Sequence, residues 1–212
     1  MGGVATLVAK DVKNQALRVT EGDETDEFLV IRLGHVDPAV NVLNVYGGIE
    51  NKMTKQEVTE NWVRLKKEIS KIKERDEGLV FIGDMNCAIG NDSLGVKDNH
   101  PKVSYGGSLI RELLETKEYF MLNALEVAEG GPWTWVSRSD SSVKSSLDLV
   151  VLSANLMPYL TKMLVDKEQK FSGKKVGIAR GKEKVVRSDH FPIIVTLENM
   201  PKAKLKKHNE YS

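Results

Sequence analysis

The chain has 212 residues, of which 41% are hydrophobic, and its 31 basic and 30 acidic residues give a net charge of +1. This length suits one domain, and the charge balance excludes a uniformly basic surface, although a local basic patch would suffice to bind nucleic acid. With one cysteine, Cys87, and no apolar run near the ~18 residues of a membrane helix, we expect an intracellular protein, nuclear or cytoplasmic, with no internal disulfide and no membrane segment.

The first part of the chain predicts three short strands. Gly3–Ala9 is apolar and partly β-branched, and Phe28–Leu33 has the pattern of a half-buried strand. Val40–Tyr46 alternates between apolar and polar residues and ends at Gly47-Gly48, a pair that favours a turn.

From Thr54 the period of the apolar residues changes to that of an amphipathic helix. Their spacings are four, three, four and three residues, with lysine and glutamate elsewhere. The residues on this face are Val58, Trp62, Leu65, Ile69 and Ile72. Thr54 and Glu57 fit a capping box, and the helix is predicted to run to about Asp76. Gly78 then introduces a buried strand, Leu79–Ile82, which leads directly to the residues of greatest interest.

The second half predicts a mixture of short elements. A loop at 87–107 precedes a helix at about 108–118 and a short strand at 121–123. Trp133–Trp135 alternates, and we expect it to pair with Leu147–Leu152 across a loop rich in serine and aspartate.

The last quarter contains basic and apolar stretches. Residues 157–166 fit a helix or a strand, 167–187 predict a basic surface loop, and Phe191–Leu197 predicts the last strand. The basic tail from Lys202 is predicted to be disordered. Strands outnumber helices and the two types mix, so the predicted class is α+β or α/β, built as a layered sandwich.

Polar groups follow apolar strands or precede them in three places. They are Gly83-Asp84-Met85-Asn86, Ser146-Leu147-Asp148 and Ser188-Asp189-His190. Carboxylates, an amide and a histidine near strand ends are the groups that metal-assisted phosphodiester hydrolysis needs, because they can hold Mg²⁺, polarise a water and face the developing charge. The structural alternatives are an Asx turn at Asp84 and Asn86, a buried ion pair at Asp148 and a core-capping role for His190.

These motifs resemble those of the endonuclease/exonuclease/phosphatase superfamily, the DNase I-like proteins. The GD-x-N, LD-x-V and SDH-x-P patterns occur in order at Gly83–Asn86, Leu147–Val150 and Ser188–Pro192, and the upstream N-V-Y pattern lies at Asn44–Tyr46. The spacing is most similar to that of LINE-type retrotransposon endonucleases and the host proteins derived from them. The resemblance covers about residues 2–198.

The resemblance implies a metal-dependent phosphodiester hydrolase of the endonuclease type, with Mg²⁺ or Mn²⁺ as cofactor and DNA as partner. Asp84 would orient or deprotonate the attacking water. Asn86 and Tyr46 would contact the scissile phosphate, although Tyr46 is also explained as a surface aromatic at a strand end. Trp133 and Trp135 would stack on a base or pack in the core.

The same resemblance assigns roles to the later motifs. Asp189 would be a metal ligand, and Asp148 would hold His190, which would stabilise the charge that develops on the phosphate. A carboxylate that fixes the imidazole tautomer and raises its pKa would keep His190 protonated beside that phosphate.

The implied fold is an α+β, two-sheet β-sandwich flanked by helices in four layers. Members of the superfamily open with a strand ending in an asparagine, a helix and a strand ending in a metal-binding glutamate, all upstream of the segment with which this chain starts. We therefore expect a sandwich lacking its first two strands, with residues 1–198 as an N-terminally incomplete domain and residues 199–212 as a basic tail.

The absence of the first two strands and of the metal-binding glutamate is expected to have two consequences. The metal would be bound weakly and the activity impaired, and the competing hypothesis is a catalytically inactive, retrotransposon-derived remnant that serves as a binding or assembly module. Exposed strand edges would also favour self-association or a partner that supplies the missing strands.

Overall fold

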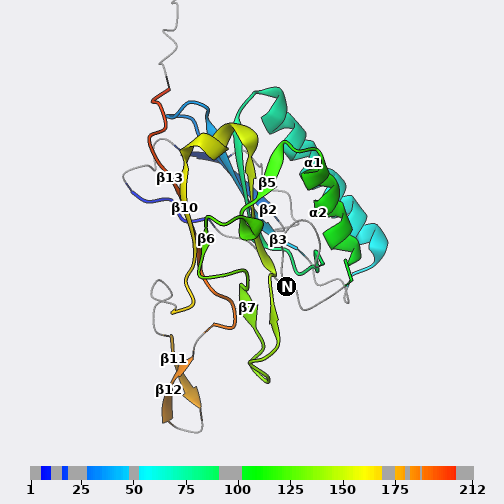
Figure 1. Ribbon diagram of the computed structural model, residues 1–212, viewed down its shortest axis with the longest axis vertical. Coiled ribbons are helices and arrows are strands. Elements are labelled where there is room, and N and C mark those ends of the chain that lie inside the picture. The colour runs from blue at the N-terminus through cyan, green and yellow to red at the C-terminus, as the bar shows by residue number, and fades with distance from the viewer. Residues whose placement is uncertain are drawn as a thin grey trace, which may run out of the picture.

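The structure is a computed structural model that describes residues 6–10, 16–18, 28–47, 53–90, 102–168, 175–179, 182–186 and 188–203. Two sheets pack face to face, and two helices cover the outer face of the larger sheet (Figure 1). The helices are α1, Lys55–Glu74, and α2, Tyr105–Glu115. This sandwich confirms the predicted α+β class, and the described residues form three of its four predicted layers. None of their helices is long and apolar enough to cross a membrane.

The larger sheet has six strands in the order β1-β2-β3-β4-β9-β5. In that order they are Ala16–Arg18, Phe28–Leu33, Val40–Tyr46, Gly78–Asp84, Asp148–Ser153 and Tyr119–Met121. Only β3 and β4 pair in parallel, with α1 as the connection between them. The smaller sheet has the order β13-β10-β6. Its strands are Ile193–Leu197, Leu160–Val165 and Ala128–Glu129. Strand β4 is therefore central to the larger sheet, with a neighbour on each side.

The local sequence explains why α1 begins where it does. The Thr54 hydroxyl accepts a hydrogen bond from the Glu57 amide at 3.2 Å, and the Glu57 carboxylate accepts one from the Thr54 amide at 2.7 Å, so the predicted capping box is confirmed. Four residues of the predicted apolar face are buried: Trp62, Leu65, Ile69 and Ile72. They pack with α2 against Phe81 and Leu43, neither of which is exposed. Burial of a side chain such as Phe81 contributes about 1.5–3 kcal/mol.

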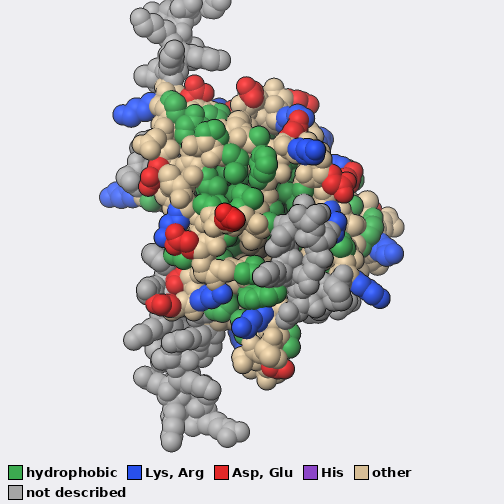
Figure 2. Space-filling view, in the orientation of Figure 1, with side chains coloured by type: hydrophobic (Ala, Val, Ile, Leu, Met, Phe, Trp, Pro, Cys, Tyr) green, Lys and Arg blue, Asp and Glu red, His purple; other side chains and the backbone are tan. Residues whose placement is uncertain are grey.

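A second core lies between the two sheets. Along β4, Leu79 and Phe81 face the helices while Val80 faces the smaller sheet, as the alternation of a strand requires. Every residue of β13 is only partly buried. In the view of Figure 2, hydrophobic side chains gather over η4, the 3₁₀ helix Ala154–Tyr159, which leads into β10. The second core is therefore covered less completely than the first.

The structure corrects three local predictions. Trp135–Val136 (β7) pairs with Lys144–Ser145 (β8) rather than with Leu147–Leu152, because β9 already has β4 and β5 as neighbours. The strand predicted at 121–123 ends at Met121 and continues as a 3₁₀ turn, η3, Leu122–Ala124. Within the loop predicted at 167–187, β11 and β12 pair as an antiparallel hairpin. These two strands are Lys175–Ala179 and Lys182–Val186.

The remaining differences concern element boundaries. Helix α2 begins at Tyr105, three residues before the predicted start, because the Ser104 hydroxyl accepts from the Gly107 amide and caps it. The ambiguous segment 157–166 divides into the end of η4 and the strand β10. Residues 6–9 of the predicted first strand have no regular structure, while residues 3–5 lie outside the described residues, as does most of the tail.

A charged cluster ties the sheet to α1 just before β4 begins. Glu77 accepts hydrogen bonds from Arg32 at 2.6 and 2.8 Å, from the Asn41 amide at 2.9 Å and from Arg75 at 3.0 Å. Burial alone would raise the pKa of Glu77, but these donors, Arg32 first, lower it from the ordinary 4.5 to about 2. The cluster therefore stabilises the fold through an ionised carboxylate.

We expect Glu77→Gln to lower the free energy of unfolding by about 1–3 kcal/mol at neutral pH, because charge-assisted hydrogen bonds are lost. The lowered pKa gives stability that is present above pH 4.5 and lost as the pH falls through about 2. Urea unfolding across this pH range should show that the free energies of unfolding of the wild type and the variant converge in acid. The exposed Glu74→Gln on the last turn of α1 is the control, and a gap that stays constant in acid would contradict the prediction.

Candidate active site

Three polar side chains lie in one row across the end of the larger sheet. Tyr46 ends β3 and pairs with Asp84, which ends β4, and Asp84 pairs in turn with Asp148, which begins β9. Residues directly opposite on neighbouring strands share a face of the sheet. For β4 and β9 this is the face of Val80 and Val150, which belong to the core between the sheets. The row is therefore the polar rim of that core.

Gly83 allows β4 and β3 to approach closely beside this row. Its φ is +155°, and a Cβ at this position would lie 1.8 Å from the Val45 carbonyl oxygen. Gly47, just after β3, is equally confined, because a Cβ there would lie 2.3 Å from the Met85 carbonyl oxygen. Glycine is thus required for steric reasons at this position of the GD-x-N motif, and the close approach of the strands sets the position of the next residue, Asp84.

Asn86 fastens the turn that follows β4. Its backbone, at a φ of 46°, places its amide 3.0 Å from Asp84 Oδ1, so the Asx turn considered as an alternative is present. Its side-chain amide donates to the Gly47 carbonyl oxygen at 2.8 Å. The Gly47 amide donates in turn to the Asp84 carbonyl oxygen at 2.7 Å. The Asx turn is therefore present, and Asp84 still lies in the row with Tyr46 and Asp148.

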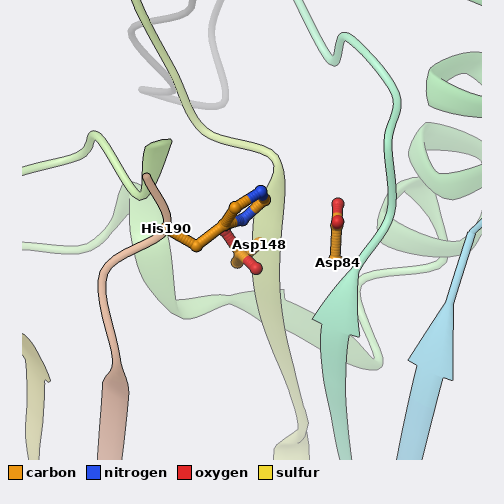
Figure 3. A group of neighbouring side chains, drawn as sticks. All are labelled: Asp84, Asp148 and His190. Atoms are coloured by element: carbon orange, nitrogen blue, oxygen red, sulfur yellow. The ribbon is translucent and has the colours of Figure 1, made fainter. Parts of the chain in front are cut away.

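His190 reaches this row from the segment that leads into β13. Figure 3 shows Asp84, Asp148 and His190 converging from three separate segments of the chain. His190 Nδ1 donates to Asp148 Oδ2 at 2.9 Å, which is the partner that a carboxylate in an apolar strand needs. A backbone bridge to Trp135 holds His190 beside β7.

Two buried residues that the sequence analysis did not identify hold Asp148 in place. The Asp148 amide donates to Thr134 Oγ1 at 2.9 Å, and the Thr134 carbonyl accepts from the Phe191 amide at 2.7 Å, so Thr134 joins the second and third motifs. Asn123 donates to the Asp148 carbonyl at 3.1 Å and accepts from the Val150 amide at 2.9 Å. A threonine between two tryptophans and an asparagine after a short strand carry no local sign of these roles.

The electrostatics of the row couple its members. The hydrogen bond to Asp148 raises the pKa of His190 above its ordinary 6.5, although burial opposes this. Burial first, and then the Asp148 carboxylate, raise the pKa of Asp84. The site therefore favours a protonated imidazole and disfavours charge on the Asp84 carboxyl.

Asp189 contacts the loop between β7 and β8. Its carboxylate accepts from Arg138 at 2.9 Å. Burial would raise the pKa of Asp189, but its own backbone amide and Arg138 lower it below its ordinary 3.8. Asp189 is thus an ionised carboxylate that pairs with an exposed arginine.

Among the residues that the structure describes, one group has the composition of a metal site. Ligand atoms of Asp84, Asp148 and His190 all lie within 4.8 Å of one another. Two carboxylates suit a hard divalent cation, which takes oxygen ligands and completes its shell with water or phosphate. His190 Nδ1 is engaged with Asp148 and favours the protonated form, so it is the weakest of the three as a ligand.

The structure also places the remaining predicted residues. Tyr46 belongs to the row and Asn86 follows it in the turn after β4, Trp133 and Trp135 are half-buried, and Cys87 is buried in the core beneath the helices. No predicted site residue lies at the opposite end of the sheet.

The fold has relatives among solved structures. No protein-family model and no curated protein matches the chain. A 3′-5′ exonuclease from Neisseria meningitidis superposes with a TM-score of 0.59 at 20% identity, over 83% of this chain and 66% of that one. An AP endonuclease from Archaeoglobus fulgidus gives 0.58 at 15% identity, over 86% and 69%.

A third similar structure is the endonuclease domain of TRAS1, a telomere-specific non-LTR retrotransposon. It gives a TM-score of 0.52 at 14% identity, over 82% of this chain and 65% of that domain. The chain therefore spans about two thirds of the length of these structures and shares their fold, which is the fold that its motifs predict.

Proposed function

We propose that this chain forms the hydrolytic part of a phosphodiesterase of the endonuclease type that cleaves DNA with Mg²⁺ or Mn²⁺. The observation that carries the proposal is the hydrogen bond between His190 and Asp148 beside Asp84, at the ends of neighbouring strands. The fold, shared with nucleases that act on DNA, supports the choice of substrate class.

The Asp148–His190 pair supplies positive charge to the phosphate. Asp148 accepts from Nδ1, so the ring keeps its second proton on Nε2 and presents that proton to a non-bridging oxygen. The raised pKa of His190 favours this charge. A donor aimed at developing charge is worth more in a half-buried site than in water.

Asp84 orients the attacking water and accepts its proton. A carboxylate whose pKa is raised by burial is a better base than a solvated one, because its ionised form gains more from taking up a proton. Asn86 and Tyr46 flank Asp84 and contact the phosphate. The Asn86 side-chain amide has two hydrogens. One is donated to the Gly47 carbonyl oxygen, and the other is donated to a phosphate oxygen of the substrate.

A divalent cation would be held by Asp84 and Asp148, with Asp189 as a further carboxylate in the next motif. When bound, the cation supplies Lewis-acid charge to the phosphoryl oxygens. Asp148 already accepts a hydrogen bond from His190, and Asp189 already pairs with Arg138. Each carboxylate would therefore interact with a metal ion and a second cation at once. We therefore propose weak metal binding and slow turnover.

Plasmid nicking and bis(p-nitrophenyl) phosphate hydrolysis test this function. We expect slow activity that needs millimolar Mg²⁺ or Mn²⁺ and stops with EDTA. Asp84→Asn should lose about 10²–10⁴-fold in rate and should also weaken Mn²⁺ binding, measured by the electron paramagnetic resonance signal of free Mn²⁺.

The control variant is Asp76→Asn. It removes the same charge from an exposed turn before β4, where a φ of 54° suits asparagine. Absence of any metal-dependent hydrolysis by the wild type, or a rate that Asp84→Asn leaves unchanged, would contradict the proposed function.

A further inference from the structure

We infer that Arg138 is a switch of the candidate active site, which pairs with Asp189 in the absence of substrate and moves to a phosphate of the DNA when substrate binds. Because Asp189 is taken as a ligand of the divalent cation, this role of Arg138 rests on the proposed function. It goes beyond that function by stating what releases Asp189 for the cation.

Asp189 directly precedes His190 but is not a member of the group that could hold a cation. Among the residues that the structure describes, that group consists of Asp84, Asp148 and His190, whose ligand atoms all lie within 4.8 Å of one another. The Asp189 carboxylate instead accepts a hydrogen bond from Arg138 Nη2 at 2.9 Å. A positive charge on this carboxylate opposes the approach of a second one, because like charges repel. Arg138 therefore competes with a metal ion for Asp189.

The ion pair is exposed enough to exchange partners. The side chain of Arg138 is 68% exposed and that of Asp189 is 26% exposed. Exposed ion pairs shift an equilibrium by a factor of about five or less, because water screens both charges. A phosphodiester accepts hydrogen bonds from a guanidinium as well as a carboxylate does. A DNA phosphate beside His190 would therefore draw Arg138 away from Asp189 at little cost.

The shape of the site does not depend on this ion pair. Backbone hydrogen bonds join the same two segments on both sides of it. The Val136 amide donates to the Asp189 carbonyl oxygen at 3.0 Å, and the Phe191 amide donates to the Thr134 carbonyl oxygen at 2.7 Å. These bonds do not involve side chains of the pair, so they remain when the Arg138 side chain changes partner.

The loop between β7 and β8 is also braced by its own hydrogen bonds. The Ser137 hydroxyl accepts from the amides of Ser139 and Asp140, at 3.3 and 3.4 Å. The Asp140 carboxylate accepts from the amide and the hydroxyl of Ser142, at 2.9 and 2.7 Å. Arg138 lies within this turn, so the backbone presents its side chain beside the site whichever partner the side chain binds.

The exchange of Arg138 couples the binding of metal and DNA. A phosphate that removes Arg138 from Asp189 favours a cation at Asp189. By linkage, a cation at Asp189 favours the binding of DNA by the same factor. The switch therefore keeps metal affinity low in the free chain and raises it when substrate is present.

The test is a double-mutant cycle of Arg138→Gln and Asp189→Asn with two measurements that do not involve hydrolysis. The first is the affinity for Mn²⁺ without DNA, from the electron paramagnetic resonance signal of free Mn²⁺. Arg138→Gln should tighten Mn²⁺ binding about 2–5-fold. It should have no effect in the Asp189→Asn background, where no carboxylate remains to compete for.

The second measurement is the binding of a fluorescent duplex in EDTA, followed by anisotropy at several salt concentrations. Arg138→Gln should weaken binding and make the slope of log affinity against log salt shallower by about 0.9, the value for one phosphate contact. Asp189→Asn should strengthen binding, because it releases Arg138. This gain should disappear in the Arg138→Gln background.

The controls change the charge of the same hairpin at exposed positions. Lys144→Gln removes a positive charge from β8 and should leave the Mn²⁺ affinity unchanged. Asp140→Asn removes a negative charge from the loop and should leave the affinity for the duplex unchanged. Effects equal to those of Arg138→Gln and Asp189→Asn would show a general effect of charge and would overturn the inference.

The outcomes separate the switch from the proposed function. If the wild type cleaves DNA but Arg138→Gln changes the Mn²⁺ affinity equally in both backgrounds, the switch is refuted and the proposed function stands. If the wild type hydrolyses neither plasmid nor bis(p-nitrophenyl) phosphate, the proposed function fails, whereas coupling in both measurements would still support the switch. Duplex binding that does not depend on Arg138 would show that phosphate is not its second partner. That result, or a chain that binds no Mn²⁺ with or without Arg138, would overturn the inference.

Discussion

The Asp148→Asn variant is expected to cleave DNA about 10²–10⁴-fold more slowly than the wild type. Asp148 Oδ2 lies 2.9 Å from His190 Nδ1 and is the main reason that the pKa of His190 is raised. An amide carries no charge, so the pKa would fall, and its N–H₂ group can turn toward the ring and favour the wrong tautomer. The backbone contacts of position 148 with Thr134 and Asn123 do not change, so the fold should persist.

The pH dependence gives this prediction a second measurement. A raised folded-state pKa means that the His190 contribution to stability is fully present below pH 6.5 and is lost as the pH rises through the folded value. The wild-type rate should fall over the same rise, and the variant should lose its charge at lower pH. NMR titration of His190 would measure the shift directly.

The control variant is Asp140→Asn, which removes an exposed carboxylate from the loop between β7 and β8. There Asp140 accepts hydrogen bonds from Ser142, and its replacement should leave the rate unchanged. An Asp148→Asn variant with the wild-type rate and the wild-type pKa of His190 would refute the assigned role.

The Gly83→Ala variant is expected to lose about 3 kcal/mol or more of folding free energy. Its φ of +155° is unfavourable for alanine, and the new Cβ would lie 1.8 Å from the Val45 carbonyl oxygen. Residues 83 and 45 are paired in the centre of the sheet, so the clash is relieved only by moving β4 away from β3. Chemical denaturation monitored by Trp fluorescence would measure the loss.

Gly131→Ala separates backbone strain from the steric clash. Gly131 has a φ of +84°, but a Cβ there would meet only the flexible end of Lys167, at 3.1 Å. We expect a loss of about 1–2 kcal/mol for this control. Equal losses for the two variants would show that contact with β3 is not what demands a glycine before Asp84.

The features that local sequence determines were predicted well. The start of α1 depends on Thr54 and Glu57, which are three residues apart, and its buried face depends on a period within one helix. The bounds of β2 and β3 also agree, because alternation along a strand is a property of the strand itself. The motifs ending β4 and beginning β9 indicated which side chains would meet, through family resemblance rather than through spacing.

Features that depend on competition between distant partners were not predicted. The partner of Trp135 could not be chosen without knowing that β4 and β5 already occupy both edges of β9. Thr134 and Asn123 act through hydrogen bonds to backbone groups, which leave no pattern in sequence. The basic, glycine-containing composition of residues 167–187 predicts a loop and gives no sign that β11 and β12 pair as a hairpin.

The order of the strands has a consequence for the protein during its synthesis. Asp84 leaves the ribosome long before Asp148 and His190, and β9 must insert between β4 and β5 before the row of polar side chains exists. Domains tend to fold as units once enough of the chain has emerged. The proposed hydrolytic centre would therefore not exist until His190 has been synthesised, and we expect a product that ends before His190 not to cleave nucleic acid.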